Sequence, residues 1–160
     1  MVQVARHPLI QFSYDSLVWQ DNSYFFLEPL KVVAYPADST LPGKYYTRYT
    51  LQAFGHDSKG NSLQFNISFD ASDPNQLVGT YRQAYSQSSG LAQAALYGLD
   101  NNNLSEYTLN PADTTAFLQI KRQSGAESLI AGTFQMILDN TRDTARKIVI
   151  TNGSLTDIIY

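Results

Sequence analysis

The side chains best suited to acid–base chemistry near neutral pH are two histidines, His7 and His56. His56 precedes Asp57, and these are the residue types of a general base and its orienting carboxylate. Catalysis would also need a nucleophile and an oxyanion site in register. The sequence has no Gly-x-Ser-x-Gly elbow, His-Glu-x-x-His helix or phosphate loop. We therefore interpret His7 as part of an N-terminal tail and His56 as a solvated hairpin-loop residue.

Paired carboxylates could hydrolyse a glycosidic bond, one acting as acid and the other as base or nucleophile. The candidate pairs are Asp70 with Asp73 and Asp139 with Asp143. Both pairs lie in predicted turns, where Asp is favoured because its side chain bonds to nearby backbone. Glu28 stands between a leucine and a proline, an apolar setting that disfavours its charged form. The alternative for Glu28 is an outward-facing residue at a strand edge.

Metal and cofactor sites have little support in the sequence. There is no cysteine, which removes thiolate metal sites, disulfides and thiol nucleophiles together. The segment Asp100–Glu106 offers several oxygen ligands for calcium. It misses the EF-hand pattern, however, with Leu104 at a ligand position and no glycine. We expect a polar turn there, and we expect no metal and no cofactor.

Tyrosine is the one enriched residue type that could bind a ligand, with eleven in the chain. One group lies within Tyr45–Tyr49, and a second consists of Tyr81 and Tyr85. Exposed aromatic side chains on a sheet can stack on sugar rings or anchor a protein partner. Alternatively, most of these rings are half-buried, with only the hydroxyl at the surface. The candidate ligand-binding or partner-binding residues are Tyr46, Arg48, Tyr81 and Tyr85, of which Tyr46 and Arg48 share a strand face.

Composition indicates an all-β protein of one domain. Of 160 residues, 43% are hydrophobic and only 16% charged, and the eight Phe and eleven Tyr suit strands. A net charge of −3 without a stripe of Lys or Arg argues against nucleic acid. No apolar run is long enough to span a membrane. We expect a single β domain over residues 1–160, with residues 1–8 as a flexible tail.

Alternating apolar and polar residues define the strands that must position these side chains. The clearest pair is Lys44–Phe54 with Leu63–Phe69, joined by a hydrophilic loop with a glycine near its end. Leu91–Leu99 has the leucine spacing of two helical turns, but its flanking polar clusters favour a strand. Further strands are expected at Ile10–Tyr14, Leu30–Tyr35, Leu77–Tyr85, Glu106–Leu109 and Thr114–Lys121. The turn signals indicate an antiparallel β-sandwich or lipocalin-like barrel of about 8–10 strands.

The C-terminal block Leu129–Tyr160 gives the strongest fold signal. Two alternating apolar runs flank the polar segment Asp139–Lys147, as in a β-hairpin, and Asn152-Gly153 is a predicted turn before a last strand. The residues predicted to face the core are Ile130, Phe134, Met136, Leu138, Ile148 and Ile150. Any binding surface is therefore expected elsewhere, near Tyr45–Tyr49 or the Ser86–Gly90 loop.

The same block resembles the ending of uncharacterised small lipoprotein β-domains of Bacteroidetes-type bacteria. The residues that carry the resemblance are Ile130-Ala-Gly-Thr-Phe-Gln-Met, Lys147-Ile-Val-Ile-Thr-Asn-Gly and the final Ile-Ile-Tyr. Upstream, Gly60-Asn61 and Gly79-Thr-Tyr stand in a similar order. The resemblance implies export, lipidation near the N-terminus and tethering in the periplasm or on the outer surface. Met1–Pro8 has neither a lipobox cysteine nor the apolar stretch of a signal peptide, so a cytoplasmic location is the alternative.

These features together favour a non-catalytic, exported or surface-tethered binding module with an unknown protein or glycan partner. One alternative is a lipocalin-like carrier that holds a small hydrophobic ligand inside the barrel. Its test is whether the inward residues fill the interior or line a hole. These residues are Leu63, Phe65, Ile67, Phe69, Phe134 and Met136. A further alternative is a carboxylate-dependent glycan hydrolase.

Overall fold

The computed structural model describes residues 10–21, 28–33, 45–83, 90–98, 105–126 and 129–159, which form strands and turns without a helix. The strands are β1 (Ile10–Tyr14), β2 (Leu17–Asp21), β3 (Glu28–Val33), β4 (Tyr45–Asp57), β5 (Ser62–Ala71), β6 (Gly79–Arg82), β7 (Gly90–Tyr97), β8 (Glu106–Leu109), β9 (Phe117–Ser124), β10 (Leu129–Asn140) and β11 (Lys147–Ile159). The predicted all-β class is confirmed. The predicted N-terminal tail and most of the Ser86–Gly90 loop lie outside the described residues. None of the described segments is a helix long and apolar enough to cross a membrane.

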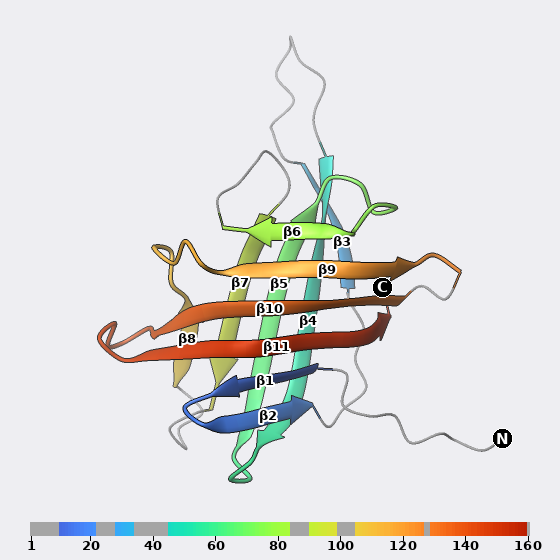
Figure 1. Cartoon of the computed structure of the whole chain (residues 1–160). Coiled ribbons are helices and arrows are strands. Elements are labelled where there is room, and N and C mark those ends of the chain that lie inside the picture. Colours follow the sequence, from blue (N-terminus) through green and yellow to red (C-terminus); the bar gives the residue numbers. More distant parts are fainter. Residues whose placement is uncertain are drawn as a thin grey trace, which may run out of the picture.

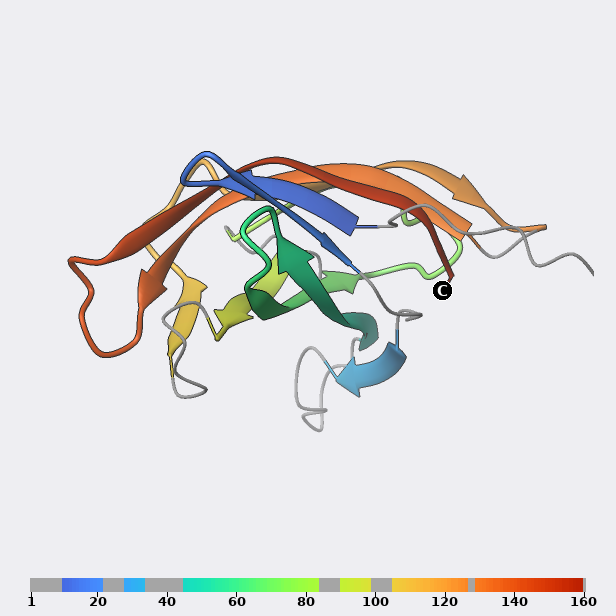
Figure 2. The ribbon, with the colours of Figure 1, turned by 90° about the horizontal axis from the view of Figure 1, so that it is seen from below.

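Eight strands close into an antiparallel β-barrel, in the order β11-β1-β2-β4-β5-β7-β8-β10. The pairing of β10 with β11 completes the circle. Figure 1 shows two layers whose strands cross, with β1, β2, β9, β10 and β11 in front of β4, β5 and β7, and Figure 2 shows both layers from below. Of the two predicted architectures, a sandwich and a barrel, the protein therefore adopts the barrel, which is consistent with a lipocalin-like fold.

The two long strands β4 and β10 change partner along their length. Residues 45–50 of β4 pair with β3, whereas residues 55–57 pair with β2. Residues 129–135 of β10 pair with β9, and residues 138–140 pair with β8. Strand β6 in turn pairs with β9. These changes leave β3, β6 and β9 as extensions outside the closed circle.

Aromatic rings fill the centre of the barrel and join its two layers. The centroid of the Phe65 ring lies 4.9 Å from that of Phe12 and 5.5 Å from that of Phe134. Trp19 stacks on Phe12 at 4.9 Å. All four side chains are buried, and the six residues predicted to fill the interior or line a hole belong to the same cluster. The interior-facing side chains therefore pack against one another.

The C-terminal block forms the hairpin of β10 and β11, and its six predicted core residues are all buried. The predicted turn at Asn152-Gly153 is wrong, because both residues lie inside the continuous strand β11. Asn152 has a φ of 51° and lies between Ile150 and Gly153, the partners of Met136 and Phe134, where β11 has one residue more than β10, so Asn152 belongs to a β-bulge. A Cβ atom at residue 153 would lie 2.4 Å from Cδ2 of Phe134. Glycine at this position is therefore what lets the Phe134 ring pack.

The other strand predictions are largely confirmed. Residues 45–54 and 63–69 of the two predicted runs lie in the hairpin of β4 and β5, and residues 91–97 of the ambiguous segment Leu91–Leu99 lie in strand β7. The prediction that Asp70 and Asp139 lie in turns is wrong, because they lie within strands β5 and β10. In both cases a side chain on the neighbouring strand supplies a cationic partner.

Candidate functional site

Arg48, one of the four candidate binding residues, is engaged in an ion pair between two strands. Its Nε and Nη2 atoms lie 2.8 and 3.0 Å from the two carboxylate oxygens of Asp70. The Asp70 side chain is fully buried, and the Arg48 side chain is 36% exposed. The two residues are direct partners in the β4–β5 register, so the ion pair links these strands. Tyr46 lies in β4, but its side chain and all of Tyr85 fall outside the described part of the structure.

Tyr81 belongs to the core, so its prediction as a surface contact is wrong. Its side chain is buried, and its ring centroid lies 4.8 Å from that of Phe69. Its hydroxyl donates to the Leu77 carbonyl oxygen at 2.7 Å. Burial, together with the neighbouring Tyr49, raises its pKa to about 12. Alternation in the short strand β6 explains the outcome, because the residues on both sides of Tyr81 face outward.

The neighbours His56 and Asp57 point to opposite faces of β4 and cannot act together as a catalytic pair. His56 is exposed, whereas Asp57 is buried. The Asp57 carboxylate accepts hydrogen bonds from the Tyr14 hydroxyl and from the backbone N–H groups of Lys59 and Asn61. Burial opposes its charge, but these bonds hold the pKa of Asp57 below its usual range. Asp57 therefore stabilises the β4–β5 turn.

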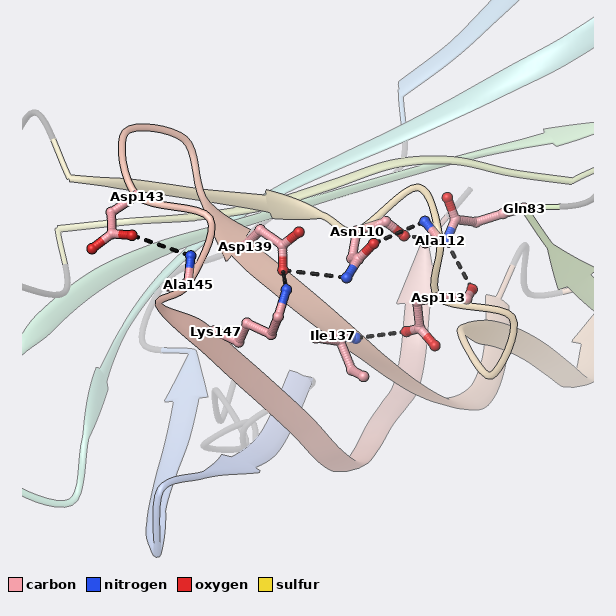
Figure 3. Close-up of polar contacts among 9 residues, drawn as sticks. All are labelled: Gln83, Asn110, Ala112, Asp113, Ile137, Asp139, Asp143, Ala145 and Lys147. Atoms are coloured by element: carbon pink, nitrogen blue, oxygen red, sulfur yellow. Dashed lines mark hydrogen bonds and ion pairs between the residues drawn. The ribbon is translucent and has the colours of Figure 1, made fainter.

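The carboxylates of the predicted pair Asp139 and Asp143 also make structural contacts (Figure 3). Asp139 accepts hydrogen bonds from Lys147 Nζ at 2.8 Å and from Asn110 Nδ2 at 3.3 Å. Asp143 accepts one from the backbone N–H of Ala145. One carboxylate thus joins β10 to β11 and the other shapes the turn between them.

Asp113 lies in the β8–β9 loop, beside the residues of β10 that pair with neither β9 nor β8. Its Oδ2 accepts a hydrogen bond from the backbone N–H of Ile137 at 2.8 Å, and Ile137 O accepts one from Asn110 N at 2.9 Å. Gln83 Nε2 donates to the carbonyl oxygens of Asn110 and Asp113, which fixes this connection from the other side (Figure 3). The β8–β9 loop therefore replaces a missing strand partner with side-chain and backbone bonds.

Asp113 is expected to make the fold less stable in acid. Burial opposes its charge, but hydrogen bonds from Thr115 and Ile137 hold its pKa below the ordinary 3.8. A lowered native pKa stabilises the fold above the unfolded-state pKa, and this stabilisation is lost as the pH falls from about 4 toward the native pKa. Urea unfolding between neutral pH and about pH 3 should show a smaller loss of stability for Asp113→Asn than for wild type. Equal losses would contradict this role.

Glu28 and the calcium hypothesis receive no further support. The Glu28 side chain and most of the Asp100–Glu106 segment lie outside the described residues. Among the residues that are described, no group of three or more His, Cys, Asp or Glu is placed to hold a metal ion.

An open groove of about 470 Å³ lies on the outer face of β4, β5 and β7. Phe54 is the register partner of Gln64, Gln64 is the partner of Tyr97, and Tyr97 is the partner of Glu106 on β8. We name these four residues the outer row. They point away from the core, because in each strand the adjacent residues are buried. The groove is lined by Phe54, Gly55, His56, Ser62, Leu63, Gln64, Tyr97 and Gly98.

The outer row combines an aromatic surface with hydrogen-bonding groups held in place. The Phe54 side chain is 50% exposed. Tyr97 and Glu106 are register partners, and partial burial together with the Glu106 carboxylate raises the pKa of Tyr97. Gln64 Nε2 donates to Asn66 Oδ1 at 3.0 Å, which orients the amide. Such a row can contact an apolar ring face and bond to hydroxyl groups at the ring edge.

Sequence reasoning did not select Phe54, Gln64 or Tyr97. The signal for the first two was present, because alternation in the predicted hairpin places Phe54 and Gln64 on its outer face. Tyr97 lay in the segment whose helix or strand character was ambiguous, and its distance along the chain hid its place beside Gln64.

Comparison with known proteins does not assign a family or a function to the outer groove. No family model, no curated protein and no solved structure matches the chain.

Proposed function

We propose that this protein is a non-catalytic binding module whose outer groove holds a sugar ring of a glycan. The observation that carries the proposal is the outer row, in which the half-exposed Phe54 ring, the Gln64 amide and the Tyr97–Glu106 pair stand side by side on three adjoining strand pairs. The sheet backbone fixes their spacing, so binding needs little reordering of the protein.

Sugar rings suit this combination of side chains. A pyranose presents C–H groups on its faces, which pack against an aromatic ring, and hydroxyl groups around its edge. The Gln64 amide and the Ser62 hydroxyl, which line the groove, can each bond to such hydroxyls. The volume of about 470 Å³ falls within the range of small-ligand sites.

The distribution of exposed apolar side chains supports a glycan over a protein partner. A stable protein interface buries about 800 Å² on each side and centres on clustered large side chains. Among the described residues, the exposed large hydrophobic side chains are Phe54, Val78 and Val149. They lie on β4, just before β6 and on β11, which is too scattered for an interface core.

The arrangement of acidic and interior residues supports binding at the surface over the two alternatives. Asp70 bonds to Arg48, and Asp73 accepts from the backbone N–H of Asn75, so this predicted catalytic pair is held in structural contacts. The six inward residues named for a hydrophobic carrier pack within one buried cluster. Export and surface tethering are included in the proposal because of the resemblance of the C-terminal block. A cytoplasmic location is the alternative.

Phe54→Ala is expected to weaken glycan binding about tenfold, because an aromatic contact is worth roughly 1–1.5 kcal/mol. Wild type is first screened on a glycan array, and its best ligand is then titrated by calorimetry. Val149→Ala is the matched control, because it truncates a similarly exposed apolar side chain outside the groove.

Two outcomes would overturn the proposal. One is a wild-type protein that binds no glycan on the array. The other is equal affinity of Phe54→Ala and Val149→Ala for the wild-type ligand. Binding of a fluorescent fatty acid instead, unchanged in Phe54→Ala, would favour the hydrophobic carrier.

A further inference from the structure

We infer that the glycan is an uncharged chain of several rings, whose further rings lie along β4, β5 and β7 beyond the outer groove. These rings follow one that is held at Phe54, so they depend on the proposed function. Two more rows of side chains continue the outer face of the same strands. They are Gln52, Asn66, Ala95 and Thr108 in the nearer row, and Thr50, Ser68 and Gln93 in the farther row. We name the residues of these two rows the neutral face.

The neutral face is continuous with the outer row. Within β4, Phe54, Gln52 and Thr50 are two residues apart, so all three point outward and are spaced by ~6.8 Å along the strand. Gln64 Nε2 donates to Asn66 Oδ1 at 3.0 Å, which joins the outer row to the nearer row. A glycan chain that leaves the ring at Phe54 and follows the strands therefore meets hydrogen-bonding side chains at each step.

The neutral face offers a low floor beside exposed amides. Ala95 and Ser68 have short side chains and are buried. The longer side chains of Gln52 and Gln93 are exposed. These two glutamines stand on β4 and β7, which flank β5 on its two sides. A sugar ring that rests on Ala95 and Ser68 therefore has an amide on either side of it.

The amides of Gln52 and Gln93 are available to a ligand. Neither side chain hydrogen-bonds to another group in the described part of the structure, and the same holds for the Thr108 hydroxyl. Each amide offers N–H donors and a carbonyl acceptor, which suits sugar hydroxyls because these both donate and accept. By contrast, the Thr50 and Ser68 hydroxyls lie 3.1 Å apart and bond to each other. The two glutamines and Thr108 are therefore the expected polar contacts of the further rings.

The absence of charge on the neutral face favours an uncharged glycan. None of its residues is Asp, Glu, Lys or Arg. Recognition of an acidic sugar relies on charge-assisted hydrogen bonds from arginine or lysine. The next cation along β4 in this direction is Arg48, which is paired with Asp70, and the outer row carries the carboxylate of Glu106. A carboxylated or sulfated chain would therefore gain no ionic contact on the neutral face and would meet a like charge in the outer row.

The test is calorimetric titration of the full chain with oligosaccharides of one to four rings, built from glucose, mannose, galactose or N-acetylglucosamine. Oligogalacturonates of the same lengths are the acidic comparison. For the neutral series that binds best, affinity is expected to rise at least about tenfold from one ring to three, because the added rings gain hydrogen bonds on the neutral face. The oligogalacturonates should bind more weakly at every length.

Gln52→Ala combined with Gln93→Ala should remove most of this gain and leave the affinity for a single ring unchanged. Both side chains are exposed, so the double variant should match wild type in urea unfolding. Gln11→Ala combined with Gln20→Ala is the matched control, because it removes two exposed glutamine side chains of β1 and β2 outside the groove and the neutral face. The control should bind each length as wild type does.

Three outcomes would overturn the inference while the proposed function stands. The first is equal affinity for one ring and for three rings. The second is loss of the gain in the control variant, which would place the further rings over β1 and β2. The third is binding of oligogalacturonates as tight as that of the neutral series. If wild type binds no oligosaccharide of any series or length, the proposed function itself fails.

Discussion

Replacing Phe65 with alanine is expected to lower the free energy of unfolding by about 3–5 kcal/mol. The Phe65 side chain is fully buried, and its ring contacts those of Phe12, Phe134 and Trp19 at centroid distances of 4.9, 5.5 and 6.1 Å. Truncation removes these contacts and leaves a cavity between the layers of the barrel, which the fixed strands can close only in part. Urea unfolding followed by tryptophan fluorescence measures the loss, with Trp19 as the only tryptophan.

Phe54→Ala is the matched control for this prediction. The two phenylalanines lie on paired strands, but the Phe54 side chain is 50% exposed and faces the outer groove. Its truncation should cost less than about 1 kcal/mol. A cost of Phe65→Ala as small as that of Phe54→Ala would mean that the interior is loosely filled. Such a result would favour the hydrophobic carrier over the surface-binding module.

The closed barrel could not be separated from a sandwich by sequence, because closure depends on strand β11. Its register partners include residues of both β10 and β1, which requires one unbroken strand through Asn152-Gly153. Asn-Gly is the strongest short turn signal, yet a β-bulge needs the same left-handed conformation. The local conformational preference of Asn-Gly is therefore the same in a hairpin turn and in a β-bulge. The difference lies in tertiary packing, where Gly153 makes room for the Phe134 ring.

Alternation predicted which face of each strong strand is buried, and it was confirmed from Leu63 to Ile67 and in the C-terminal hairpin, whereas the next polar residue, Ser68, is buried. Alternation did not predict whether charged residues near the strand ends lie in strands or in turns. Asp70 and Asp139 resemble turn residues because aspartate bonds readily to local backbone. In the structure, ion pairs with Arg48 and Lys147 compensate for their place in strands. Such partners follow only from the register between strands.

The residues of the outer groove could likewise be predicted from the sequence only in part. The β4–β5 hairpin register brings Phe54 beside Gln64, and this pair follows from the sequence once the hairpin is recognised. Tyr97 joins them because β7 follows β5 around the barrel, which no local pattern encodes.

Replacing Arg48 with methionine is expected to destabilise the fold by about 3 kcal/mol. The variant keeps much of the aliphatic stem but removes the guanidinium group that contacts both oxygens of Asp70 at 2.8 and 3.0 Å. Asp70 is fully buried, so its carboxylate would lose its cationic partner in a site with little access to water. We place the cost at the lower end for a broken buried pair, because the Arg48 side chain is 36% exposed and water can enter from its side.

Arg122→Met is the control, because Arg122 pairs with Asp157 at 3.1 Å while both side chains are more than half exposed. That change should cost less than about 1 kcal/mol. A double variant, Arg48→Met with Asp70→Leu, should recover much of the stability lost in Arg48→Met, because it also removes the buried carboxylate that Arg48 contacts. Urea unfolding of the four proteins separates the two kinds of ion pair. If Arg48→Met costs no more than Arg122→Met, the pair between β4 and β5 behaves as a solvated surface contact, and Arg48 would regain its place among the candidate ligand contacts.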